Sequence, residues 1–158
     1  MEAKIENARR NGLELTETIA FYRLAEELKT KDHRLALGKI IEASDAADKA
    51  ALDFLPDIQV DIDFLEDLVQ GKACKARLRF ANEGKAMARD VCVRMQGDLE
   101  VSAPICLPKL RGGEKVAVEI EVLPKAKGEV KGVLMLECKP VLSNDTVGFE
   151  TEFDVRVD

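Results

Sequence analysis

Residues 78–95 read LRFANEGKAMARDVCVRM, and this stretch decides the fold class of half the chain or more. Apolar side chains fall at every second position up to Phe80, the chain turns at Asn82-Glu83-Gly84, and the alternation resumes at Val91 and Val93. Two-residue alternation on both sides of an Asn/Gly turn predicts two β-strands joined by a short connection.

The same period recurs up to the C-terminus. Seven segments show it: 58–64, 74–80, 91–95, 99–101, 116–122, 130–138 and 149–157. Strands that follow one another without intervening helices exclude a parallel α/β sheet. Their number and spacing predict an all-β, Ig-like antiparallel sandwich of seven strands in residues 56–158.

The first part of the chain has a different rhythm, with apolar residues about every 3.6 positions, which predicts helices. Gly12 ends a short first helix, Thr16 caps a second, and Asp32 caps a third that ends before Pro56. We therefore expect an α+β chain organised by segments. A helical hairpin of three helices, the first short, occupies residues 1–55, and the sandwich follows.

Charge and hydropathy restrict the partners. The formal net charge is -6, which argues against general binding of nucleic acid or of anionic membranes. The chain has no apolar run near 18 residues and no signal-peptide pattern, so we expect no membrane insertion. The expected location is cytoplasmic, or extracellular if the chain is excised from a longer secreted protein.

The four cysteines stand singly, and His33 is the one histidine, so no zinc site and no cofactor is expected. Cys74 and Cys138 take inward positions, but at opposite ends of strands that would run parallel, which is too far apart for a disulfide. We expect all four cysteines to be reduced.

No residue pattern indicates catalysis. Paired carboxylates such as Asp61 and Asp63 lie on strand faces without an implied pocket, whereas acid/base catalysis needs carboxylates in differing environments. Basic residues Lys75, Arg77 and Arg79 alternate on one outward face and could suggest an anion site. In Ig strand order they lie between two acidic strands, which predicts a ladder of salt bridges. We therefore expect that the chain is not an enzyme.

Two surfaces are candidates for interaction. Cys92, Val133 and Met135 share the outward parity of two adjacent strands, where most outward positions elsewhere are charged. Two interpretations stay open: the N-terminal helices cover this patch, or it binds a partner. The third helix carries an apolar face whose alanines permit close approach of another helix, either within the chain or from a second copy. The residues of that face are Leu37, Ile40, Ile41, Ala43, Ala47, Ala50 and Ala51.

A family resemblance follows from four motifs. N-E-G-K-A-x-A-x-D-V-x-V at 82–93, G-D-L-E-V at 97–101, L-x-x-G-E-K-V at 110–116 and P-x-x-x-G-E-V at 124–130 resemble the CARDB-type (cell-adhesion-related) Ig-like domains of archaeal proteins. The resemblance covers about residues 56–158. It implies an Ig-like fold and an interaction or spacer module without shared catalytic residues. The stretch 136–140 departs from the family by lacking its aromatic and acidic pair.

The expected function is therefore a non-enzymatic protein-interaction or scaffolding module. It would self-associate, for example as a homodimer, or dock an unknown protein partner through Cys92, Val133, Met135 and the helix alanines Ala43, Ala47 and Ala50. The alternative is a module that binds carbohydrate or a cell-surface polymer. The chain has one Tyr and no Trp, which disfavours aromatic stacking on sugars.

Overall fold

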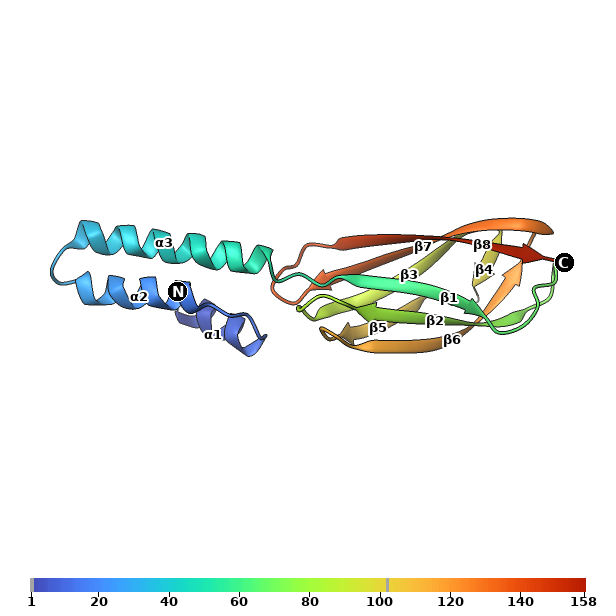
Figure 1. Ribbon diagram of the computed structural model, residues 1–158, viewed down its shortest axis with the longest axis horizontal. Helices are drawn as coiled ribbons and strands as arrows, with labels where there is room; N and C mark the ends of the chain where they lie inside the picture. Colours follow the sequence, from blue (N-terminus) through green and yellow to red (C-terminus); the bar gives the residue numbers. More distant parts are fainter. Residues whose placement is uncertain (1, 102) are drawn as a thin grey trace. The chain divides into compact units, whose positions relative to one another are not determined.

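The computed structural model describes residues 2–101 and 103–158. It divides between Leu55 and Pro56 into two compact parts, a helical unit and a β-sandwich (Figure 1). The division coincides with the point where the period of apolar side chains changes. None of the described helices is long and apolar enough to cross a bilayer.

The helical unit contains α1 (Glu2–Arg10), α2 (Thr16–Leu28) and α3 (His33–Leu52), with α2 and α3 side by side in opposite directions. Gly12 ends α1 in the left-handed conformation, with φ +85°. Asp32 caps α3, because its carboxylate accepts hydrogen bonds from the backbone N–H groups of Arg34 and Leu35, both at 3.0 Å. The predicted end of α1 at Gly12 and the predicted cap of α3 at Asp32 are both confirmed.

The predicted cap of α2 is wrong. The N-cap position belongs to Leu15, which makes no side-chain capping bond, and Thr16 is the first helical residue. Leu15 is buried, so apolar packing fixes the start of α2 in place of a hydroxyl cap. The core of the unit is built mostly from small side chains. Its buried residues include Ala8, Leu13, Leu15, Thr18, Ala25, Ala36, Ala43 and Phe54.

Gly38 offers a test of the helical unit, because a Cβ added at this position in α3 would meet no heavy atom within 4 Å. Gly38→Ala should raise the free energy of unfolding of the unit by about 0.5–1 kcal/mol, since Ala loses less backbone entropy in a helix. Far-ultraviolet circular dichroism during thermal unfolding measures this. Gly12→Ala is the matched control and should lower the midpoint, because φ is positive there. A lower midpoint of thermal unfolding for Gly38→Ala would contradict the finding that there is room for a Cβ at position 38.

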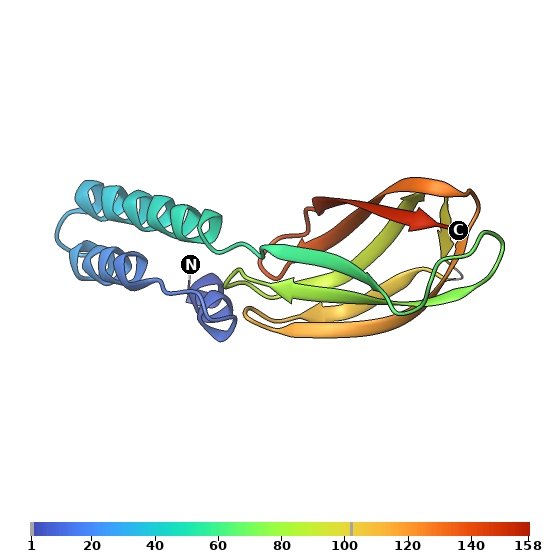
Figure 2. The ribbon, with the colours of Figure 1, turned by 45° about the vertical axis from the view of Figure 1, so that its right-hand side comes forward.

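The sandwich has two four-stranded antiparallel sheets (Figure 2). Its strands are β1 (Ile58–Phe64), β2 (Cys74–Asn82), β3 (Ala88–Gly97), β4 (Leu99–Val101), β5 (Ile105–Leu110), β6 (Lys115–Pro124), β7 (Gly128–Pro140) and β8 (Val147–Val157). The first sheet has the order β1-β2-β6-β4 and the second the order β5-β3-β7-β8. This confirms the predicted helical segment followed by an antiparallel sandwich.

The residues that the structure describes form eight strands where alternation predicts seven, and the additional strand is β5. Pro104 precedes this strand and Pro108 lies within it, which obscures the strand pattern. β5 is at the edge of its sheet, where a residue without a backbone N–H is tolerated. The inward residues of the other strands follow the predicted parity. Fully buried ones include Val60, Leu78, Phe80, Val91, Leu134 and Leu136.

Asn82 is the buried polar residue that joins the two sheets at one end. Its Nδ2 donates to the carbonyl oxygens of Ala86 at 2.8 Å and Leu110 at 3.2 Å. Its Oδ1 accepts from the backbone N–H of Asp57 at 3.2 Å and of Gly84 at 3.1 Å. All hydrogen-bonding positions of the carboxamide are therefore used, within a residue that is almost completely buried.

Asn82→Asp keeps the acceptor oxygens and removes both donors, which leaves two carbonyl oxygens facing a carboxylate. We expect the free energy of unfolding of the sandwich to fall by about 2–4 kcal/mol, because buried groups lose their partners. Urea unfolding followed by circular dichroism measures it. Asn144→Asp is the control, since Asn144 is exposed and its change should stay within about 0.5 kcal/mol. Equal effects of the two substitutions would contradict the role of the Asn82 amide.

Candidate interaction surfaces

The structure brings Cys92, Val133 and Met135 onto the outward face of the second sheet, and we call these three residues the outer patch. In the β3–β7 pairing, Met135 lies opposite Arg94 and Val133 opposite Gln96. On the other side, β8 places Glu150 opposite Met135 and Glu152 opposite Val133. The outer patch is therefore half-buried, apolar and bordered by charged side chains.

The expectation that all four cysteines are reduced is wrong for two of them, because Cys92 forms a disulfide with Cys106. The two residues lie directly opposite each other in the β3–β5 pairing, with their Cα atoms 4.1 Å apart. The seven strands predicted from the sequence do not include β5, so they offer no partner strand that contains Cys106. The apolar residues Ile105 and Leu107, on either side of Cys106, show the two-residue alternation that could have indicated this strand. The disulfide adds Cys106 to the edge of the outer patch.

Cys74 and Cys138 are free and buried, as the sequence predicts. Burial raises the pKa of the Cys138 thiol to about 11. Burial also raises the pKa of the Cys74 thiol, with a smaller contribution in the same direction from the carboxylate of Glu66. Both side chains therefore stay protonated at neutral pH and act as small apolar core residues.

Reduction of the Cys92–Cys106 disulfide should lower the free energy of unfolding of the sandwich by about 2–4 kcal/mol, because the reduced unfolded chain gains freedom. Chemical unfolding with and without dithiothreitol measures the change. The Cys92→Ser/Cys106→Ser double variant is the control and should not respond to the reductant. Alkylation of the denatured, unreduced chain should modify two thiols; modification of four would contradict the disulfide.

The outward face of the first sheet carries the predicted salt-bridge ladder. Arg77 pairs with Glu119 of β6 at 3.1 Å, and Arg79 pairs with Asp63 of β1 at 2.6 Å. Lys75 lies opposite Glu121 in the β2–β6 register. These exposed pairs contribute little stability, about 0.2–1 kcal/mol each, but they neutralise the basic strand. The ladder therefore does not offer a site for an anion.

An open groove of about 510 Å³ lies between β5 and β6. Its apolar lining includes Val101, Ile105 and Val118, and its charged side chains, Lys75 and Glu121 among them, come from the outward ladder. Among the residues that the structure describes, no group of three or more His, Cys, Asp or Glu side chains is placed to hold a metal ion.

The alanines predicted to form an interaction surface on α3 lie mostly inside the helical unit. Ala43 is completely buried, so its side chain packs within the unit and cannot contact a partner; its assignment to a surface is wrong. Ala47 and Ala50 are half-buried. Helix geometry explains why Ala43 is buried while Leu37 is exposed. The two residues are six positions apart, so their side chains point in directions that differ by about 120°.

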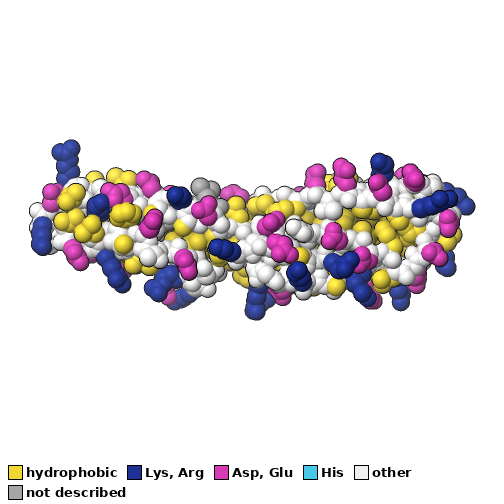
Figure 3. Space-filling view, viewed as in Figure 1, with side chains coloured by type: hydrophobic (Ala, Val, Ile, Leu, Met, Phe, Trp, Pro, Cys, Tyr) yellow, Lys and Arg dark blue, Asp and Glu magenta, His cyan; other side chains and the backbone are white. Residues whose placement is uncertain are grey.

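The exposed apolar residues of α3 lie on another side of the helix. Leu37 is 58% exposed, Ile40 39% and Ile41 54%, and we call these three residues the α3 stripe. Figure 3 shows hydrophobic side chains among the charged ones on the surface of the helical unit. The sequence predicts one broad face that holds both the α3 stripe and the alanines. The spacing of Leu37, Ile40 and Ile41 was the signal that could have separated them.

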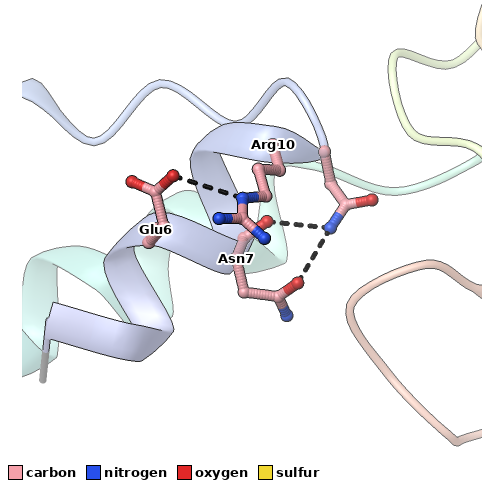
Figure 4. Close-up of polar contacts among 4 residues, drawn as sticks. Glu6, Asn7 and Arg10 are labelled. Atoms are coloured by element: carbon pink, nitrogen blue, oxygen red, sulfur yellow. Dashed lines mark hydrogen bonds and ion pairs between the residues drawn. The ribbon is translucent and has the colours of Figure 1, made fainter.

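The exposed side of α1 is polar by contrast (Figure 4). Arg10 pairs with Glu6 one turn earlier at 3.2 Å. The Asn11 amide donates to the carbonyl oxygen of Asn7 at 2.8 Å, at the end of the helix. α1 therefore presents charged and amide groups where α3 presents aliphatic ones.

Comparisons with known proteins identify a fold and no family. No protein-family model matches the chain, and no curated protein matches it. A structure of Escherichia coli alpha-2-macroglobulin, from domain MG7 to the C-terminus, is similar with a TM-score of 0.52 and 14% identity, over 67% of this chain and 17% of that one.

Two further solved structures match less closely. The CARDB domain of a Pyrococcus furiosus protein is 17% identical with a TM-score of 0.49, over 66% of this chain and 90% of that domain. The ASH/PapD-like domain of human CEP192 is 16% identical with a TM-score of 0.42, over 63% of this chain and 84% of that one. At such identities the similarity concerns the fold, and fold does not determine activity.

Proposed function

We propose that this chain is a non-enzymatic protein-interaction or scaffolding module that binds through aliphatic surface. The observation that carries the proposal is the exposure of large aliphatic side chains on α3, where Leu37 and Ile41 are each more than half exposed. Contiguous apolar surface of this kind marks interaction sites in folded proteins, because water contact with it is unfavourable.

The pKa shifts of the described thiols and tyrosine give no sign of an activated nucleophile. Three described groups have a shifted pKa: Tyr22, Cys74 and Cys138. Burial is the first cause in each case and raises the pKa, so each group favours its neutral form. A thiol or phenol acts as a nucleophile or base through its anion, which needs the opposite shift or a partner that removes the proton.

The outer patch is the second contact surface in this proposal. Its apolar groups lie between Arg94 of β3 and the acidic side chains of β8, which gives it the apolar centre and charged border of a small protein interface. The Cys92–Cys106 disulfide fixes β5 beside this patch.

The disulfide also favours an extracellular or otherwise oxidising location, because disulfides are rare in cytosolic proteins. We therefore propose the extracellular alternative for the location of this chain. Alkylation of acid-quenched cells that finds Cys92 and Cys106 reduced in the native protein would contradict this location.

Cross-linking of native cells, followed by mass spectrometry, tests the proposal. Cross-links from Lys39, which lies near the α3 stripe in sequence, should join this chain to a protein, and Ile41→Asp should reduce their yield at least tenfold. Met135→Asp should likewise reduce the yield of cross-links from Lys131 and Lys139, the lysines of β7 on the same face as the outer patch. Both substitutions replace exposed or half-exposed side chains, so the circular dichroism of the purified variants should not change. Absence of any cross-linked protein would contradict the proposal.

A further inference from the structure

We propose that the α3 stripe binds the α3 stripe of a second copy of this chain, with the two α3 helices antiparallel across a two-fold axis near Ile41. This inference rests on the proposed interaction function and names its partner. The proposed contact is made by the α3 stripe and not by the alanine face, because the side chain of Ala43 is buried inside the helical unit.

The spacing along α3 suits pairing of two helices. Leu37, Ile41, Ser44 and Asp48 follow one another at intervals of four, three and four residues, which keeps them on one side of the helix. Ile40 lies beside them. The row from Leu37 to Asp48 is about 16 Å long, three turns of helix.

The charges at the two ends of this row are complementary to themselves. Arg34 lies seven residues before Ile41 and Asp48 seven residues after it, and both are exposed. Neither forms a salt bridge within the described part of its own chain. If two α3 helices cross antiparallel at Ile41, each Arg34 faces the Asp48 of the other copy.

A parallel arrangement would place Arg34 beside Arg34 and Asp48 beside Asp48, and like charges oppose it. The antiparallel arrangement also sets the opposite ends of the two helix dipoles side by side. A partner of different sequence would need its own matching charges, whereas a second copy supplies them by symmetry. This self-complementarity favours a second copy of the chain as the partner of the α3 stripe.

The α3 stripe has three large side chains per copy, fewer than an obligate dimer buries. We therefore expect a reversible dimer with a Kd on the order of 1–100 µM, in the range of small interfaces. Sedimentation velocity of the purified full chain across this concentration range should show a monomer–dimer equilibrium.

Substitutions separate the stripe from the rest of α3. Ile41→Asp places two carboxylates at the axis and should weaken the dimer at least tenfold. Leu35→Asp is the matched control: Leu35 is 49% exposed but points about 120° away from Ile41, and its change should leave the Kd within twofold.

Charge reversal tests the direction of the helices. Arg34→Asp and Asp48→Arg should each weaken the dimer about tenfold, and the double variant should recover a Kd within threefold of the original. Each reversal also suits the helix dipole, with an acid near the N-terminus and a base near the C-terminus, so α3 stays helical. Circular dichroism of each variant verifies this.

Three outcomes would overturn the inference: a monomer at every concentration, a dimer that Ile41→Asp does not weaken, or a double variant as weak as the single ones. If the purified chain is a monomer but still cross-links to another protein through the α3 stripe in cells, the pairing with a second copy is overturned and the proposed interaction function stands. A monomer without any cross-linked partner overturns the proposed function as well.

Discussion

The arrangement of the sandwich depends on the four hydrogen bonds of the Asn82 carboxamide. Asn82 ends β2 in the first sheet, and its Nδ2 reaches Leu110 at the end of β5 in the second sheet. Its Oδ1 binds the backbone just before β1, at Asp57. One buried amide therefore fixes three chain segments that are distant in sequence. Gly112 supports this junction, since a Cβ there would overlap the carbonyl oxygens of Gly84 and Lys85.

Alternation predicted most of the sandwich because burial on one face repeats every second residue, whatever the partner strand is. It could not predict features that depend on which strands meet. Asn82 reads as a turn residue in the sequence, and its contacts with Leu110 appear only when β5 is in place. The disulfide has the same origin, since Cys92 and Cys106 become neighbours through the register of β3 and β5.

The candidate surfaces were predictable to different degrees. The outward parity of Val133 and Met135 followed from alternation together with Ig strand order. On α3, the sequence shows more apolar residues than one helix partner can cover, and periodicity alone does not say which side meets α2. Packing selected the small side chains such as Ala43, because they let the helix axes approach closely, and it left Leu37 and Ile41 to solvent. The expected alanine surface and the α3 stripe are thus two sides of one helix.

The distribution of sulfur in the sandwich has a consequence for redox chemistry. The disulfide lies on the outward face of the second sheet, while the thiols of Cys74 and Cys138 are enclosed in the core and kept protonated by their raised pKa. Thiol–disulfide exchange requires a thiolate that can reach a sulfur of the bond. The native fold withholds both thiolates, so rearrangement to a wrong pairing must wait until the sandwich opens, and the correct connectivity persists as long as the protein stays folded.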